Sequence, residues 1–250
     1  MGSVYGPNMV TDGLFMYFDA ANVQSYPGSG TTWNDLSNNN FQSTDVDGNL
    51  SIANYTPSSA GSTAKALISP NNIAEYVSIP DNVLFDFRGA MSWDFVACME
   101  NTSDRQSIWS QINTGSPWHG MGVASLSMDS NAQLSWWPGN YYPGTGWWAS
   151  GITTTINKWW YCAGTVSGSA FKMYARTVGA STMSTATLTD SNGWNGATST
   201  NTFRIGDNGT SGQASHCLDG AIAFVKLYNR QLSDAEVTQN YNAHKSRFGL

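Results

Sequence analysis

The chain has 250 residues, enough for one large domain, and its hydrophobic fraction of 40% supplies a core, which argues against a disordered protein. Only 11% of the residues are charged, against ~25% in an ordinary soluble domain, while neutral polar residues are abundant. The formal net charge of -6 leaves no broad basic surface, and this argues against binding nucleic acid through its phosphates.

The expected cellular setting follows from the start of the chain and from its cysteines. Residues 1–6 lack an apolar segment, so we expect no secretory signal, and no run approaches the ~18 apolar residues of a membrane span. The cysteines Cys98, Cys162 and Cys217 are odd in number and lie in apolar segments, which favours buried free thiols over a disulfide. We therefore expect a protein made in a cytoplasm, without membrane contact.

Short segments of alternating hydrophobicity, separated by turn residues, run through most of the chain. Residues 167–169 (Ser-Gly-Ser) predict a hairpin turn between strands at 158–166 and 170–177. Short strands at such regular spacing predict a β-sandwich or jelly roll. The other expected strands lie at 14–18, 49–53, 64–68, 74–79, 91–99, 106–112, 120–128, 132–137 and 202–206.

The segment 218–250 predicts a buried strand followed by a short helix. Only Lys226 breaks the apolar character of the strand, so both of its faces should be covered. Strict alternation puts Ala221, Ala223, Val225 and Leu227 on one face, and Ile222, Phe224 and Tyr228 on the other.

The expected helix carries start and stop signals. Ser233 and Glu236 have the spacing of a capping box, and Gly249 can end the helix in a left-handed conformation. Leu232 and Val237 occupy the two positions of a hydrophobic staple. Val237, Tyr241, His244 and Phe248 follow at helical spacing and predict one buried stripe.

This closing segment also carries a resemblance to a known family. The pattern G-x-I-A-x-V-x-x-Y-N-R-x-L-S-x-x-E-V-x-x-N-Y at 220–241 resembles the closing strand and helix of laminin-G-like, concanavalin A-type jelly-roll domains. The opening at 12–22 (DGLFMYFDAAN), 25–30 (SYPGSG) and 32–37 (TWNDLS) resembles the same group. Together with the ending N-Y-N-A-x-K-x-R-F-G-L, this opening resembles domains of structural proteins of tailed bacteriophages in particular.

Pattern and resemblance together predict an all-β fold, a two-sheet antiparallel jelly-roll sandwich of the laminin-G/concanavalin A type with a short C-terminal helix. We expect an N-terminal arm at 1–10, which has no pattern of its own, and a single domain at 11–250.

The segment 136–148 (WWPGNYYPGTGWW) concentrates aromatic residues around two Pro-Gly turns. Exposed flat rings stack on sugars and also anchor protein interfaces, whereas the plainer alternative is an ordered loop that clamps the edge of the sandwich. Trp118 and His119 on a neighbouring loop can add polar contacts. The candidate ligand or interface residues are Trp118, His119, Trp136, Trp137, Asn140, Tyr141, Tyr142, Trp147 and Trp148.

The sequence predicts no catalytic residues. Glycoside hydrolysis needs two carboxylates that face each other about 5 to 10 Å apart, and the E-x-D-x-x-E pattern of jelly-roll glucanases does not occur. Asp94 stands alone in its strand and Glu100 falls in a turn, so we expect solvated or loop-capping carboxylates. His119, His216 and His244 are far apart, and no nucleophile elbow is present.

Calcium is the one ion that we consider as a possible ligand, because domains similar to this one sometimes bind Ca²⁺ in a rim loop. The weak candidates are Asp45, Asp47, Asp207 and Asn208, whose oxygens suit this ion. The same residues are common in ordinary turns, which is the favoured interpretation. We otherwise expect no cofactor.

The resemblance implies a non-enzymatic structural protein of the phage virion, such as a decoration, fibre or other accessory protein of head or tail. Its partners would be other virion proteins of the capsid or tail and further copies of itself as a homo-oligomer. The alternative is a lectin-like, carbohydrate-binding module that attaches the particle to host-surface glycan.

Overall fold

A computed structural model describes most of the chain. The described residues are 8–45, 51–69, 76–87, 89–101, 106–112, 120–126, 133–137, 148–194, 199–207 and 217–250, with the backbone alone described at 45, 120–126, 137, 148 and 190–193.

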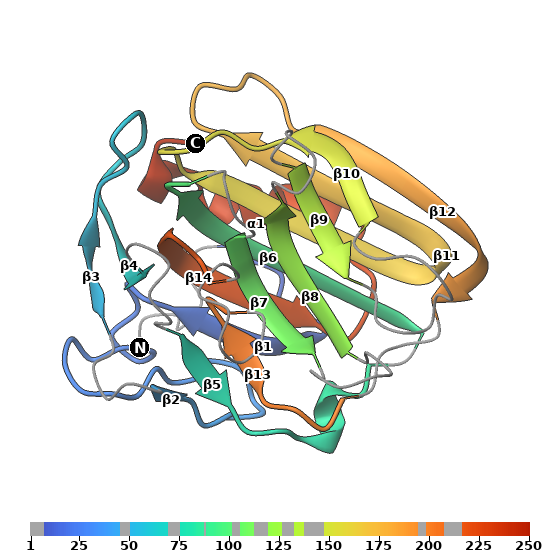
Figure 1. Ribbon diagram of the computed structural model, residues 1–250, viewed down its shortest axis with the longest axis horizontal. Helices are drawn as coiled ribbons and strands as arrows, with labels where there is room; N and C mark the ends of the chain where they lie inside the picture. The colour runs from blue at the N-terminus through green and yellow to red at the C-terminus, as the bar shows by residue number, and fades with distance from the viewer. Residues whose placement is uncertain are drawn as a thin grey trace.

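Two antiparallel sheets face each other, and α1 (Asp234–Phe248), the one α-helix among the described residues, lies behind one of them (Figure 1). The chain also forms a short 3-10 helix, η1 (Val83–Phe85). Sheet A has the order β12 (Ser184–Trp194), β11 (Trp160–Thr177), β6 (Ala90–Met99), β14 (Gly220–Tyr228), β4 (Ala64–Ser69) and β3 (Ile52–Tyr55), and β1 (Leu14–Asp19) also pairs with β14. Sheet B has the order β10 (Trp148–Thr153), β9 (Gln133–Trp137), β8 (Gly120–Leu126), β7 (Gln106–Ile112), β13 (Phe203–Ile205), β5 (Val77–Ile79) and β2 (Thr44–Asp45). The predicted two-sheet antiparallel sandwich with a C-terminal helix is confirmed.

Strand β14 lies in the middle of sheet A and is buried throughout. It pairs with β6 on one side and with β4 and then β1 on the other. A register shift between Ile222 and Phe224 places Ala223 and Phe224 on the same face. The predicted strict alternation is therefore wrong beyond this point, because a bulge inserts one residue without a partner of its own.

Strand β11 folds back on itself near Gly168, which has a φ of +54°. Its first half pairs with β6 and its second half with β12. The amide of Val178 donates to the carbonyl of Trp159 at 3.3 Å, so the ends of β11 meet. A straight strand of this length would separate them by about 55 Å. The predicted hairpin around 167–169 is confirmed.

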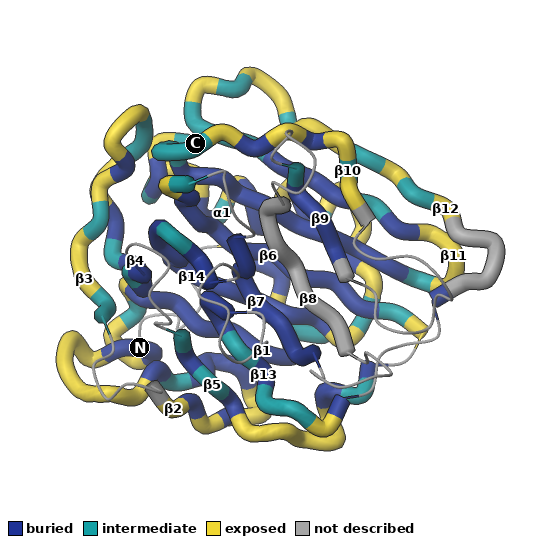
Figure 2. Tube along the Cα trace, viewed as in Figure 1, coloured by how far each residue is buried: buried dark blue, intermediate teal, exposed yellow. Residues whose placement is uncertain are grey.

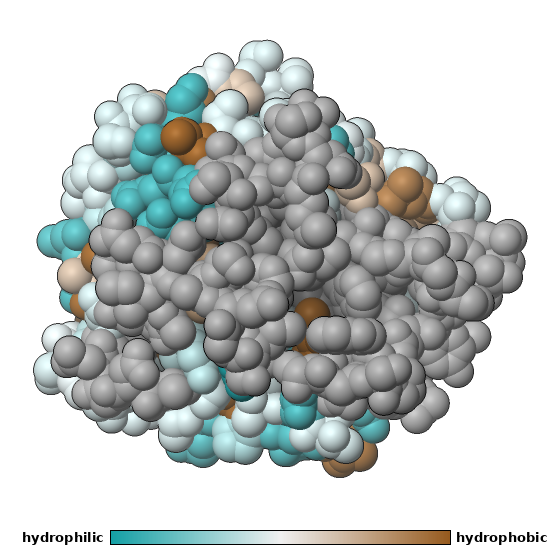
Figure 3. Space-filling model, viewed as in Figure 1, coloured by the Kyte–Doolittle hydropathy of each residue, from teal (hydrophilic) through white to brown (hydrophobic). Residues whose placement is uncertain are grey.

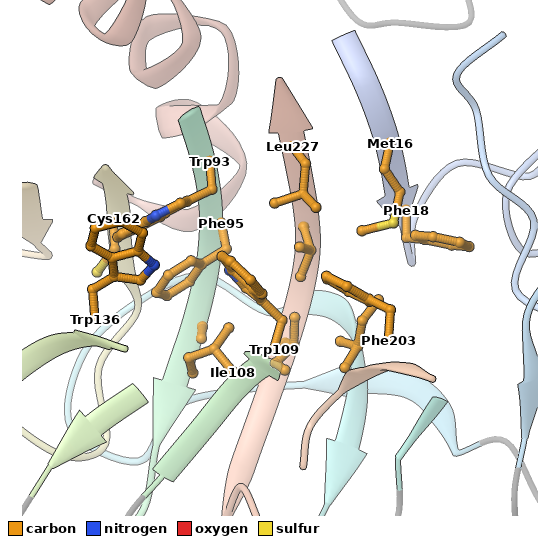
Figure 4. Close-up of a cluster of buried hydrophobic side chains, with 14 of the residues drawn as sticks. Met16, Phe18, Trp93, Phe95, Ile108, Trp109, Trp136, Cys162, Phe203 and Leu227 are labelled. Carbon is orange, nitrogen blue, oxygen red and sulfur yellow. The ribbon is translucent and has the colours of Figure 1, made fainter. Parts of the chain in front are cut away.

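The space between the sheets is filled by large aromatic side chains (Figure 4). The rings of Trp109 and Phe203 stack with centroids 5.4 Å apart, and those of Trp136 and Phe171 with centroids 4.5 Å apart. Figure 2 shows the consequence: the strands are dark blue through the middle of the molecule, and the exposed residues gather in the connections. This core holds the two sheets in a fixed relation.

A second core lies on the outer face of sheet A, under α1. The predicted capping box of Ser233 and Glu236 is present, and Gly249 has the predicted left-handed conformation with a φ of 71°. The predicted stripe of the helix is buried, and it consists of Val237, Tyr241, His244 and Phe248. No helix in the described part of the chain is long and apolar enough to span a membrane.

The residues that the structure describes in the predicted arm belong to the packed domain. Met9 and Val10 are each 6% exposed. The Val10 amide donates to Oδ1 of Asn240 at 2.8 Å, and the Tyr228 hydroxyl donates to the Val10 carbonyl at 3.2 Å. Residues 8–10 thereby join α1 to β14, while residues 1–7 lie outside the described residues.

Candidate ligand-binding face

Of the aromatic candidates, the structure describes the side chain of Trp136 alone. That side chain lies in the core with no exposed surface, stacked on Phe171. The prediction that Trp136 forms part of a ligand or interface surface is wrong, because its position in β9 points between the sheets. The candidates outside the described residues are Trp118, His119, Asn140, Tyr141, Tyr142 and Trp147.

The backbones of Trp137 and Trp148 are described as parts of strands. Trp148 pairs with Trp136, and Trp137 pairs with Gly122 of β8. Since successive residues of a strand belong to opposite faces, position 137 is on the outer face of sheet B. That is the face turned away from the core.

The strand register places two rows of residues on the outer face of sheet B. Both rows are dominated by residues with a short side chain or none. One row runs Trp137, Gly122, Ser110, Arg204, Ser78 and Thr44. The other runs Ala149, Ser135, Ala124 and Ser107. We call these two rows the sheet B face.

The sheet B face has hydroxyl groups at its centre. Ser107, Ser110 and Ser135 are each at most 1% exposed. The Ser110 hydroxyl donates to the carbonyl of Asp207 at 2.8 Å, and that of Ser135 to the carbonyl of Gln133 at 3.3 Å. The Ser107 hydroxyl has no hydrogen-bond partner among the described residues. At this degree of burial the three hydroxyl groups do not face solvent.

Arg204 closes one end of the longer row. It lies outward because its neighbours Phe203 and Ile205 point into the core. Its guanidinium is 4.7 Å from the centroid of the Tyr76 ring and 2.5 Å from a carboxylate oxygen of Asp207. The longer row thus ends in a planar group whose charge is already neutralised.

The same cluster bears on the calcium candidates. Asp207 is 4% exposed and accepts hydrogen bonds from Arg204 and from the Cys217 thiol, whose Sγ is 3.6 Å away. A positive partner at this distance weighs against a cation on the same carboxylate. The Asp45 side chain, Asp47 and Asn208 lie outside what the structure describes, and the described residues contain no group of three metal-ligating side chains.

The prediction that Asp94 is solvated or loop-capping is wrong. Its carboxylate has no exposed surface and lies 3.0 Å from Lys226 Nζ, which is equally buried. The Tyr161 hydroxyl donates to it at 3.1 Å, and Nε2 of His244 lies 3.2 Å from Lys226 Nζ. A carboxylate so enclosed under α1 cannot contact a substrate. The overlooked signal was Lys226, the one charge in a buried strand, which pairs with Asp94 across β14 and β6.

Burial controls the protonation of this group. Desolvation raises the pKa of Asp94, and the nearby Lys226 opposes that shift. Desolvation lowers the pKa of Lys226, and it also holds the pKa of His244 well below its usual value, with Lys226 and Arg247 adding to that effect. These residues stabilise the docking of α1 and lie apart from the sheet B face.

Residues 71–238, more than half of the chain, match the model of the concanavalin A-like lectin/glucanases superfamily. The chain belongs to this family. Within the curated proteins, no relative of this concanavalin A-like domain matches its sequence.

Solved structures share the fold at low sequence identity. Domain 4 of AbnA, an extracellular arabinanase of Geobacillus stearothermophilus solved in complex with arabinotriose, has a TM-score of 0.62 and 16% identity, over 92% of this chain and 99% of that one. The sialidase of Trypanosoma rangeli has a TM-score of 0.55 and 13% identity, and the match spans 94% of this chain but 33% of the sialidase chain. A second structure of that sialidase, with sialic acid, has a TM-score of 0.53 and 14% identity over the same shares of the two chains.

Proposed function

We propose that this concanavalin A-like domain is a non-catalytic carbohydrate-binding module that holds a neutral glycan on the sheet B face. The observation that carries the proposal is the longer row of that face, in which short residues lie between position 137 and Arg204. This part of the row crosses the four strands β9, β8, β7 and β13. Neighbouring strands are about 4.8 Å apart, so the four strands span about 14 Å. That width suits an extended chain of sugar rings.

The chemistry of the sheet B face supports this class of ligand. Sugars present hydroxyl groups on their rims and apolar C–H faces that stack on flat rings. Trp137 is the aromatic residue at the end of the longer row and can supply such a ring. The Arg204 charge is matched by Asp207, and only 11% of the whole chain is charged, so a neutral ligand is favoured.

A binding role without hydrolysis is supported by the placement of the carboxylates. Hydrolysis needs two carboxylates facing each other across the substrate. Asp207, beside the sheet B face, is held by Arg204, and Asp94 is buried beneath α1. The arabinanase domain that matches over 99% of its length was solved with arabinotriose, and this is a reason to begin with arabinan among the glycans tested.

Retention of the protein by immobilised polysaccharides tests the proposal. In affinity electrophoresis through arabinan, galactan, xylan and glucan, the wild type should be retarded by at least one polymer. Trp137→Ala and Trp147→Ala should abolish that retardation, and Ser110→Phe should do the same by placing a large ring in the middle of the longer row. The matched control is Leu84→Ala, which removes an exposed apolar side chain elsewhere and should leave retention unchanged.

Urea unfolding of every variant keeps a folding defect from being read as a binding defect. If no polymer and no glycan on an array retains the wild type, the carbohydrate-binding function is wrong. If the polymers retain both tryptophan variants and Ser110→Phe as strongly as the wild type, the glycan binds elsewhere than on the sheet B face.

We also propose the virion as the setting in which the domain acts, displayed by a head or tail accessory protein. The support is the resemblance of residues 12–37 and 218–250 to domains of phage structural proteins. The described surface has few large exposed apolar residues, namely Val23, Val83 and Leu84, and hydrophobic residues are isolated in the coloured part of Figure 3. Peptide mass spectrometry of purified particles should detect the protein, and its absence would remove the virion setting while leaving glycan binding to be judged separately.

A further inference from the structure

A groove lies on the outer face of sheet A, on the other side of the sandwich from the sheet B face. It is a cavity of about 470 Å³, open to solvent, between the start of α1 and the paired strands β11 and β12. Its floor includes Thr165, Lys172, Tyr174 and Thr187, and its wall includes Ser233 and Asp234. We call it the α1 groove.

The groove exists because α1 covers only part of sheet A. The helix packs over β14, β6 and the first half of β11, and the second core that it covers also includes Tyr174 from the second half of β11. The second half of β11 and β12 form the margin of the sheet beyond the helix (Figure 1). Lys172 pairs with Thr187, and Tyr174 pairs with Thr185, so these polar side chains share the outer face of sheet A, on which Tyr174 is only 4% exposed.

Asp234 is held in place by donors from β11. The Tyr174 hydroxyl donates to its Oδ1 at 2.6 Å, and Lys172 Nζ donates to its Oδ2 at 2.6 Å. Lys172 and then Tyr174 lower the pKa of this carboxyl group. Asp234 is therefore a fixed carboxylate, although 71% of its side chain is exposed.

The remaining bonding capacity of these groups indicates the class of ligand. Each oxygen of Asp234 keeps a lone pair for a ligand hydroxyl, and the Lys172 ammonium keeps further N–H donors. The charges of Lys172 and Asp234 cancel, and Glu236 is paired with Arg230 at 2.6 Å, so the lining favours a neutral ligand. The volume falls within the ~300–1,000 Å³ of small-molecule sites.

We propose that the α1 groove is a second binding site, which takes one neutral sugar unit through the fixed carboxylate of Asp234 and the donors of Lys172. The choice of ligand class rests on the proposed carbohydrate-binding function, whereas the site itself is independent of the sheet B face. Two sites on opposite faces let one domain join two glycan chains, and binding to a dense glycan surface gains from their combined affinity.

Titration of the ¹⁵N-labelled protein with D-glucose, D-galactose and L-arabinose tests the second site. The amide resonances of residues 231–236 and 172–174 should shift with millimolar affinity for at least one of these sugars. The Asp234→Ala variant should bind at least tenfold more weakly. The matched control is Asp12→Ala, which also removes an exposed aspartate in an ion pair, here with Arg230 at 2.8 Å, and should bind like the wild type.

The Trp137→Ala variant separates the two sites, because it should lose polysaccharide retention and keep the shifts at the α1 groove. Two results overturn the second site. One is that no neutral sugar shifts the resonances of these residues. This result overturns the proposal even if N-acetylneuraminic acid, a charged sugar, does shift them. The other is an affinity in Asp234→Ala equal to that of the wild type. Either result leaves the sheet B face untouched.

Discussion

Lys226 Nζ lies 3.0 Å from the carboxylate of Asp94, and neither side chain has any exposed surface. The two residues are direct partners across β14 and β6, and α1 lies over them. Each charged group has lost its hydration, so its partner and the nearby polar groups must supply the interactions that water would otherwise make. The pair therefore specifies how the helix docks on the sheet more than it adds net stability.

Removing one member of this pair should be far more damaging than removing both. We expect Asp94→Ala or Lys226→Met to lower the free energy of unfolding by about 3–5 kcal/mol, because the remaining charge is buried alone. The double variant D94L/K226M should lose less than either single variant. Urea unfolding followed by circular dichroism measures all three.

The surface pair of Lys172 and Asp234 is the control for that experiment. Its partners are partly exposed, so Lys172→Ala should lower the free energy of unfolding by less than about 1 kcal/mol. A similar loss in Lys172→Ala and Lys226→Met would contradict the importance we give to burial.

His244 should make the protein less stable in acid. Burial, with Lys226 and Arg247 nearby, holds its folded-state pKa well below the usual value of 6.5. Below about pH 6.5, His244 is therefore protonated in the unfolded chain but stays neutral in the folded chain. The free energy of unfolding then falls by up to about 1.4 kcal/mol per pH unit as the pH decreases, until the folded-state pKa is reached. His244→Phe, which keeps a ring beside Phe224, should lose this part of the slope.

The measurement is the free energy of unfolding in urea for the wild type and for His244→Phe, taken from pH 7.5 to pH 4.5, and the difference between the two proteins at each pH. The charged groups around His244 are Lys226 on β14, Asp94 on β6, Arg247 on α1 and, bonded to Arg247, Asp19 on β1. The raised pKa of Asp94 has the opposite effect, because it makes the free energy of unfolding rise as the pH falls. Both proteins contain Asp94, so the difference between their free energies of unfolding isolates the contribution of His244. Parallel curves for the two proteins would contradict the assignment to His244.

The thiols should be inert in the folded protein. Cys98, Cys162 and Cys217 are free and buried, as the sequence predicted. Burial raises the pKa of Cys98 and that of Cys217 to about 12, and it also raises the pKa of Cys162. Because the thiolate is the reactive form, Ellman's reagent at pH 8 should label all three only in urea. Fast labelling of any one thiol in the native protein would contradict this burial.

Gly164 should not tolerate a side chain. It pairs with Trp93 across β11 and β6, and a Cβ on residue 164 would lie 2.2 Å from Cζ2 of the Trp93 ring. We expect Gly164→Ala to lower the free energy of unfolding by about 1–3 kcal/mol through overpacking. If the ring contact is the cause, the double variant G164A/W93F should lose less than the sum of the single variants. An additive result would assign the loss to the backbone instead.

Trp136 and Trp137 should separate stability from binding. Trp136→Ala empties a core position, so it should lower the free energy of unfolding by about 3–5 kcal/mol. Its retention by polysaccharide should fall only in proportion to the unfolded fraction. Trp137→Ala should show the reverse, with stability kept and retention lost. Equal effects of the two substitutions on both measurements would contradict their assignment to opposite faces.

The parts of the fold that the sequence predicted well are set by local interactions. Ser233 and Glu236 are three residues apart, so the cap of α1 could be recognised without knowing its surroundings. The bulge at Ala223 could not, because it depends on the register between β14 and β6. Strand β12 was also missed, since Thr185, Thr187 and Thr189 are exposed and the apolar signal is limited to Ala186, Leu188 and the distant Trp194.

The candidate site was less accessible to sequence reasoning. The aromatic segment was visible as composition, but the role of each tryptophan depends on the face of β9 to which it belongs. Ser110 and Arg204 gave no signal, because they become neighbours only when β7 and β13 pair. The Asp94 and Lys226 pair is equally non-local, with one residue on β6 and the other on β14.

The central place of β14 also constrains how the protein is made. It is the last of the strands in chain order, yet β1, β4 and β6 all pair with it. On the ribosome these three strands therefore emerge without the neighbour that joins them, and their backbone edges toward β14 stay unpaired until residues 220–228 are synthesised. Such long-range pairing slows folding and exposes the nascent chain to aggregation. Completion of sheet A is thus tied to the synthesis of residues 220–228, and the earlier strands depend on that late segment to acquire their shared neighbour.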